Sequence, residues 1–190
     1  MTKSIMIVGV GGQGSLLAST LLGKLLVTEG YDVKVSEVHG MSQRGGSVVT
    51  YVRYGDKVYS PIIEKGAADC IISFEKLEAA RWVQYLKKDG VIITNTQQID
   101  PMPVVIGAVE YPADILTEVA QKVKVDALDA LSLAEQAGSS RAVNIVLMGR
   151  LARQLDIPVE NWKNALKSVV KPQFVDINLK AFDLGYNYGN

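Results

Sequence analysis

Residues 4–14 read SIMIVGVGGQG, an apolar run that ends in closely spaced glycines. Gly9, Gly11 and Gly14 match the pattern G-x-G-x-x-G, and a segment with helical periodicity follows them. In this pattern the first glycine allows a tight turn, the second lets a phosphate approach the backbone, and the third lets the helix pack closely on its strand. The stretch therefore predicts a strand, an anion-binding turn, and a helix whose N-terminal end faces that turn.

The same alternation of strand and helix continues along the chain. We predict strands over residues 4–8, 32–38, 47–54, 69–74, 90–95, 104–109 and 122–126. We predict helices over residues 13–29, 76–86 and 112–121, and further helices from Ala127 onward. Runs such as IMIV, CIIS and VIIT are typical of strands that are buried on both faces. The sequence thus predicts an α/β fold with a doubly wound, mostly parallel, Rossmann-like sheet, helices on both faces and a helical C-terminal third.

Two stretches break the alternation, and two helices are unusually apolar. Residues 47–54 and 57–59, separated by a turn that contains Gly55, predict an antiparallel hairpin at an edge of the sheet. Helices 13–29 and 141–154 are apolar around more than one face, which favours deep burial or a subunit contact. The aromatic-rich segment 161–188 predicts a helix that closes over the core, with packing on another subunit as an alternative.

Length and composition limit the possible functions. The chain has 190 residues with 20 basic and 20 acidic side chains, so we expect one domain over residues 1–190 and no nucleic-acid partner. One cysteine allows neither an internal disulfide nor a cluster held by four thiolates. The N-terminus has too few apolar residues for a signal peptide, and no apolar stretch is long enough to span a membrane. We therefore expect a cytoplasmic protein with no membrane partner.

A second glycine-rich loop, HGMSQRGGS over residues 39–47, follows the second predicted strand. Arg44, Gly45 and Gly46 could form another anion-binding turn, because successive backbone N–H groups beside a guanidinium suit a phosphate or carboxylate. We expect both glycine-rich loops to leave the carboxyl ends of adjacent strands, where such sheets bind ligands. A flexible surface loop is the alternative.

Glu37 is a candidate for binding the ribose of a dinucleotide, because it lies 23 residues after Gly14 at the end of the second predicted strand. His39 is the single histidine, and we interpret it as an ordinary loop residue. Cys70 lies in an apolar strand and is interpreted as an inert small side chain.

Four segments together resemble the gamma-type domain of 2-oxoacid:ferredoxin oxidoreductases, and within that family the smaller (beta) subunit of indolepyruvate ferredoxin oxidoreductases. They are GVGGQG at residues 9–14, EVHGMSQRGG at 37–46, DCIISFEKLEAAR at 69–81 and SRAVNIVLMG at 140–149. The resemblance covers nearly the whole chain. It implies that an aryl 2-oxoacid such as indolepyruvate is decarboxylated on thiamine diphosphate, that electrons pass through iron–sulfur clusters to ferredoxin, and that the acyl group leaves on coenzyme A.

The resemblance also implies a division of labour. This chain lacks the G-D-G…N-N pattern expected of a thiamine diphosphate and magnesium site, and it lacks the cysteines for a cluster. A larger alpha subunit is therefore implied to hold the thiamine diphosphate, the magnesium and the iron–sulfur clusters and to meet ferredoxin, while this chain holds no metal and is inactive alone. The resemblance gives these candidate binding residues: Gly9, Gly11, Gly12, Gln13, Gly14, Ser42, Gln43, Arg44, Gly45 and Gly46. Glu37 joins them as a candidate from its spacing after Gly14.

Three hypotheses remain for these residues. The loops contact the phosphate-bearing end of coenzyme A through Arg44, or they form only a docking surface for the partner subunit. A third hypothesis, based on Glu37 and the first glycine turn, is a separate NAD(P)-dependent oxidoreductase.

Overall fold

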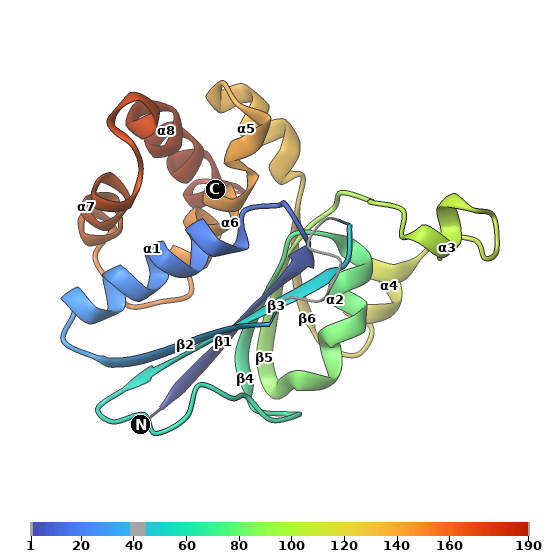
Figure 1. Cartoon of the computed structure of the whole chain (residues 1–190), viewed down its shortest axis with the longest axis horizontal. Coiled ribbons are helices and arrows are strands. Elements are labelled where there is room, and N and C mark those ends of the chain that lie inside the picture. The colour runs from blue at the N-terminus through green and yellow to red at the C-terminus, as the bar shows by residue number, and fades with distance from the viewer. Residues whose placement is uncertain (1, 39–44, 190) are drawn as a thin grey trace.

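The computed structural model describes residues 2–38 and 45–189, and it contains a six-stranded sheet in the order β2-β3-β1-β4-β5-β6 (Figure 1). The strands are β1 Lys3–Val10, β2 Asp32–Val38, β3 Ser47–Gly55, β4 Ala68–Ser73, β5 Leu86–Asn95 and β6 Lys124–Leu128. Strands β1, β4, β5 and β6 pair in parallel, whereas β3 is antiparallel to both of its neighbours, β1 and β2. The prediction of a mostly parallel α/β sheet is confirmed.

Helices cover both faces of the sheet (Figure 1). They are α1 Ser15–Thr28, α2 Lys76–Trp82, α3 Met102–Val105, α4 Ile115–Ala120, α5 Ala130–Ala137, α6 Val143–Ala152, α7 Val159–Val169 and α8 Val175–Tyr186. Short 3-10 turns lie at Val83–Tyr85, Ser140–Ala142 and Pro172–Phe174. Helices α2 and α4 lie on one face, and α1 with the C-terminal helices lies on the other. Within residues 2–38 and 45–189, no helix has the length and apolar character needed to cross a membrane.

The prediction of a hairpin between residues 47–54 and 57–59 was wrong. Residues 57–59 form no strand, and β3 lies between β2 and β1 rather than at the edge. Side chains hold the segment after β3: Arg53 donates to the carbonyl of Ser60 over 3.0 Å, and Asp32 accepts from the amide of Val58 over 2.9 Å. The strand therefore completes the sheet internally instead of pairing with the residues that follow it.

The strand predicted over residues 104–109 was also wrong. This apolar run begins in the short helix α3 and continues into a turn, because the chain leaves the sheet after β5 and returns to it only at β6. A β-branched run becomes a strand only when it has a neighbouring strand to pair with.

The strands divide their side chains between two cores. Ile5 and Ile7 of β1 face α1 and α6, whereas Met6 and Val8 face α2 and α4. All four are buried, as expected for a central strand of a covered sheet. Helix α1, unlike the central strand β1, is not buried all round. Leu16 is 63% exposed, whereas the α1 residues that pack on the sheet, such as Leu21 and Leu25, are buried.

The C-terminal helices form a second helical layer around α6. Nine residues of α6 are buried. The rings of Trp162 and Phe182 are fully buried with centroids 6.0 Å apart, so the predicted closure of the core by this aromatic-rich segment is confirmed. Helices α6 and α8 cross very closely at Gly149 and Gly185. A Cβ added at Gly185 would lie 1.9 Å from the carbonyl oxygen of Val146, so only glycine fits this crossing.

Candidate functional site

The two glycine-rich loops meet at the carboxyl end of β1. Strand β3 runs antiparallel to β1, so Ser47 at its start lies opposite Val10. The amide of Gly11 donates to the carbonyl of Gly46 over 2.9 Å. The loops are therefore adjacent, but the contact is made by the start of β3, since β2 and β1 are not neighbours in the sheet.

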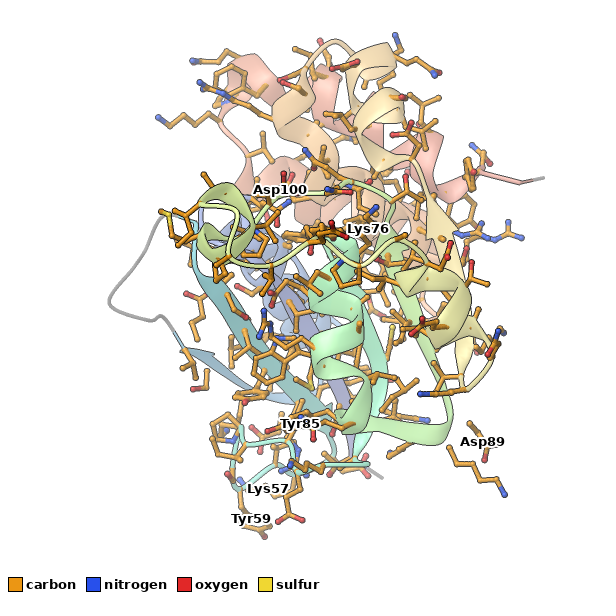
Figure 2. The ribbon with its side chains drawn as sticks, turned by 90° about the vertical axis from the view of Figure 1, so that its right-hand side faces the viewer. Lys57, Tyr59, Lys76, Tyr85, Asp89 and Asp100 are labelled. Atoms are coloured by element: carbon orange, nitrogen blue, oxygen red, sulfur yellow. The ribbon has the colours of Figure 1, made fainter. Side chains whose placement is uncertain are left out.

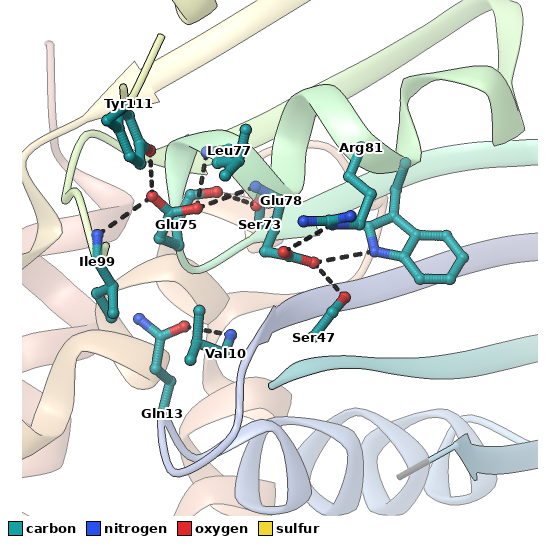
Figure 3. A network of polar contacts seen from close by, with 11 residues as sticks. Val10, Gln13, Ser47, Ser73, Glu75, Leu77, Glu78, Arg81, Ile99 and Tyr111 are labelled. Atoms are coloured by element: carbon teal, nitrogen blue, oxygen red, sulfur yellow. Dashed lines mark hydrogen bonds and ion pairs between the residues drawn. The ribbon is translucent and has the colours of Figure 1, made fainter. Parts of the chain in front are cut away.

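The first glycine turn is fixed largely by Gln13. The Gln13 side-chain oxygen accepts from the amide of Val10 over 2.7 Å (Figure 3). Its side-chain nitrogen donates to the carbonyl of Phe74 over 3.0 Å. The amide of Gln13 donates to the Val10 carbonyl over 3.2 Å. Gly9 packs beside this side chain, because a Cβ added there would lie 2.8 Å from the Gln13 Oε1. The structure thus gives Gln13 the role of closing the turn and fastening it to the end of β4.

Gly14 connects the turn to the C-terminal layer. Its φ angle is +87°, and its carbonyl accepts from Nδ2 of Asn144 over 3.1 Å. Asn144 belongs to α6 and is only 3% exposed, so the start of α1 is fastened to the most buried helix of the protein.

Gly12 and Gly45 differ from these packed glycines. Both have positive φ angles, +99° and +80°, and a Cβ built at either would meet no atom of residues 2–38 and 45–189 within 4 Å. Against these residues their backbones are open, one in each loop, with the Gly11–Gly46 hydrogen bond between the loops. Backbone N–H groups in such turns can bind an anion.

Ser42, Gln43 and Arg44, together with His39, lie outside the described residues. Gly45 and Gly46 form the described end of the second loop.

The structure separates Glu37 from the first glycine turn. Glu37 lies on β2 opposite Thr50 of β3, and its carboxylate accepts from the hydroxyl of Ser19 over 2.8 Å. A ribose-binding acid should stand on the strand next to β1, but β3 occupies that place. With about 4.8 Å between neighbouring strands, β2 lies about 10 Å from β1. This arrangement does not bring Glu37 together with the candidate residues of the first glycine turn, Gly9 to Gly14.

Glu78, which the sequence interpretation missed, anchors the second loop. Its carboxylate accepts from the hydroxyl of Ser47, from Nε1 of Trp82 over 3.1 Å and from Nε of Arg81 over 2.9 Å (Figure 3). Glu78 is only 4% exposed, and a buried carboxylate with several donors is a strong, directional anchor. It links the first residue after the glycines to α2.

Glu75 forms a second buried anchor on the same helix. One carboxylate oxygen accepts from the amides of Leu77 and Glu78, which caps α2, and the other accepts from the amide of Ile99 and the hydroxyl of Tyr111. Burial, together with the hydrogen bond to Glu75, raises the pKa of Tyr111 above its ordinary value. An acidic residue placed between a buried strand and a helix was the available sequence signal for this cap.

Asn95, at the end of β5, connects this strand to the residue that follows β4 and to the start of α5. Its side-chain nitrogen donates to the carbonyl of Phe74 over 3.3 Å, the same carbonyl that Gln13 reaches, and its oxygen accepts from the amide of Ala130 over 3.1 Å. The ends of β1, β4 and β5 and the start of α5 therefore form one connected hydrogen-bond network.

Cys70 is buried in β4, and burial raises the pKa of its thiol above the ordinary value. A thiol in that state is a poor nucleophile and a poor ligand. Over the described ranges, no group of three or more His, Cys, Asp or Glu side chains is placed to hold a metal ion. The chemistry that this edge offers is the binding of an anion by backbone amides.

Comparison with known proteins assigns this arrangement to a family. Residues 4–188 match the family described as pyruvate ferredoxin/flavodoxin oxidoreductase. The chain is 46% identical over 190 residues to a Pyrococcus horikoshii protein named indolepyruvate oxidoreductase subunit IorB, and the match covers 96% of this chain and 93% of that protein.

Two solved structures share the fold. One is pyruvate oxidoreductase subunit PORC from Thermotoga maritima, with a TM-score of 0.75 and 21% identity over 97% of this chain and 95% of that chain. The other is a 2-oxoglutarate:ferredoxin oxidoreductase from Magnetococcus marinus with 2-oxoglutarate, coenzyme A and succinyl-CoA bound. Its TM-score is 0.76 at 19% identity, and the match covers 97% of this chain but 30% of that one.

Proposed function

We infer that this chain, which belongs to the pyruvate ferredoxin/flavodoxin oxidoreductase family, is the smaller subunit of a 2-oxoacid:ferredoxin oxidoreductase that acts on indolepyruvate. The family is that of oxidoreductases acting on the oxo group of a 2-oxoacid, with ferredoxin as the acceptor. The choice of indolepyruvate is supported by the 46% identity to a relative named for that substrate. In this proposal residues 1–190 form one gamma-type domain.

The larger subunit is proposed to hold the thiamine diphosphate, the magnesium and the iron–sulfur clusters, and to pass electrons to ferredoxin. This chain offers no ligands for an iron–sulfur cluster, because its one cysteine is buried in β4 with a raised thiol pKa. Among the residues that the structure describes, no group of three or more His, Cys, Asp or Glu side chains is placed to hold a metal ion. The coverage of only 30% of the Magnetococcus marinus chain supports the proposal that further polypeptide is needed for the complete enzyme.

The two glycine-rich loops are proposed to receive the phosphate-bearing end of coenzyme A. The observation that carries this proposal is the hydrogen bond from the Gly11 amide to the Gly46 carbonyl, which brings the loops together. The open backbones at Gly12 and Gly45 are each next in the sequence to one partner of this bond. The structural neighbour with coenzyme A bound supports this choice of ligand. Arg44, with Ser42 and Gln43 beside it in the sequence, would supply the charged contact to a phosphate.

Replacing Arg44 in the reconstituted two-subunit enzyme tests this proposal. Arg44→Ala should raise the KM for coenzyme A about tenfold or more, because one charge-assisted hydrogen bond is lost. The matched control is Lys57→Ala, which removes a basic side chain at the opposite end of the sheet (Figure 2) and should leave that KM unchanged. An unchanged KM in Arg44→Ala would contradict the coenzyme A role.

The docking-only alternative has a distinct outcome. If Arg44→Ala combined with Gly11→Ala leaves both activity and the KM for coenzyme A at the wild-type values in an intact complex, the loops serve only as contact surface. A separate dinucleotide enzyme requires the isolated chain to bind NAD(P), and isothermal titration of the chain alone measures this directly.

A further inference from the structure

The segment between β5 and α4 leaves the body of the protein as an arm, which we define as residues 98–112, with α3 at its tip (Figure 1). Four large apolar side chains on the arm are strongly exposed: Met102 is 68% exposed, Val105 66%, Ile106 69% and Val109 56%. Single exposed apolar residues are common, but a concentration of them on one projecting segment marks an interaction site.

The tip of the arm has a defined conformation. The amides of Val105 and Ile106 donate to the carbonyls of Pro101 and Met102 over 3.1 and 3.0 Å. Gly107 follows with a φ angle of +72°, and the amide of Ala108 donates to Pro103 over 2.9 Å, which is the usual left-handed ending of a helix. The apolar side chains are therefore presented on a preformed turn.

The base of the arm is fastened at both ends to Glu75. The amide of Ile99 and the hydroxyl of Tyr111 both donate to the same oxygen of this buried carboxylate (Figure 3). The Nζ of Lys76 lies 4.9 Å from the centre of the Tyr111 ring, so α2 holds the base from a second position. A segment fastened in this way loses little conformational freedom when it binds a partner.

The charged side chains that the arm itself carries are all acidic. Between Lys88 and Lys122 the chain contains no lysine or arginine. Asp100 and Glu110 flank the tip and are exposed, and Asp114 and Glu118 continue the acidic border toward α4. The surface that fits this arm must therefore be apolar at its centre and basic at its rim.

We propose that the arm docks into an apolar groove with a basic rim on the larger subunit. This inference rests on the proposed function, because it takes the larger subunit as the partner. The arm begins after the carboxyl end of β5, the edge of the sheet that also carries the glycine-rich loops. Docking through the arm holds that edge against the subunit that carries the reacting substrate.

Replacement of an exposed apolar residue on the arm by aspartate tests the docking. Ile106→Asp should raise the dissociation constant for the larger subunit at least about 100-fold, because an unpaired carboxylate enters the apolar centre of the contact. The matched control is Tyr59→Asp, since Tyr59 is 89% exposed at the opposite end of the sheet (Figure 2) and should leave that constant unchanged. Circular dichroism should show wild-type folding for both variants.

A dissociation constant that is unchanged in Ile106→Asp overturns the arm as the docking element, even when the wild-type chain binds and supports activity. If the wild-type chain binds no larger subunit, the proposed function and the arm proposal both fail. A variant that only dissociates a homodimer of this chain, with unchanged binding to the larger subunit, identifies a second copy as the partner and also overturns the proposal.

The basic rim has a test of its own. Glu110→Lys should weaken association with the larger subunit about tenfold at low salt, and added salt should reduce the difference from the wild-type chain. Tighter or unchanged binding of Glu110→Lys contradicts a basic rim.

Discussion

The glycines at the α6–α8 crossing and the glycines in the two loops are required for opposite reasons. At Gly149 and Gly185 an added Cβ would lie 2.1 and 1.9 Å from backbone oxygens of the facing helix. At Gly12 and Gly45 the same atom would meet nothing within 4 Å in the described part of the chain, and there the positive φ angle is what favours glycine. A glycine that faces the backbone of another helix is therefore required for close packing. A glycine that has a positive φ angle and no close neighbour instead leaves its backbone amide accessible to a ligand.

Gly185→Ala should give the largest loss of stability. The methyl group would clash with the carbonyl oxygen of Val146. This oxygen belongs to the backbone, so it cannot move aside as a side chain can. We expect the free energy of unfolding to fall by about 3 kcal/mol or more. Denaturant unfolding measures this value, and Gly30→Ala is the matched control, because Gly30 has a φ of +88° but no atom within 4 Å of an added Cβ. Equal losses in the two variants would remove the distinction between packing and loop glycines.

Gly14→Ala should have an intermediate effect, because Gly14 combines a φ of +87° with a neighbour 2.5 Å away, the side-chain nitrogen of buried Asn144. We expect a loss of about 2 kcal/mol in the free energy of unfolding. A double-mutant cycle with Asn144→Ala checks the cause, since the second substitution should cost less stability in the Gly14→Ala background than in the wild type. Strict additivity would assign the whole effect to the φ angle.

Gly45→Ala should have the smallest effect on stability and a clear effect on function. Strain at a φ of +80° should cost about 1 kcal/mol of unfolding free energy, with no clash. The KM for coenzyme A in the reconstituted enzyme should nevertheless rise several-fold, because the added Cβ occupies the open space beside the backbone. A stability loss with an unchanged KM would show that this open side does not face the ligand.

Much of the fold could be predicted from local patterns. The strand 32–38 was predicted with the bounds that the structure gives to β2, and the strand–turn–helix at residues 4–29 was predicted because its glycines and periodicity agree. The order of the strands could not be predicted, since the insertion of β3 between β2 and β1 depends on long-range pairing. The exposed arm was mistaken for a strand because its β-branched residues have the composition of a buried strand.

The candidate site was predictable in part. The two loops meet through Gly11 and Gly46, but the expectation that they follow adjacent strands was wrong, because β3 lies between β2 and β1. The anchors Glu75, Glu78 and Asn95 were missed, because an isolated acidic or amide side chain carries no periodic pattern. Their roles depend on partners far along the chain, such as Ser47 for Glu78 and Ala130 for Asn95.

The position of β3 has a consequence for the order in which the sheet assembles. In the described sheet β2 has β3 as its one neighbour, and β3 in turn is paired with β1 from Ser47 to Tyr54. The second strand in the chain therefore joins the rest of the sheet only through the third. We expect β2 to join the folding sheet after β3, and its amide hydrogens to exchange with solvent faster than those of β1 in the native protein.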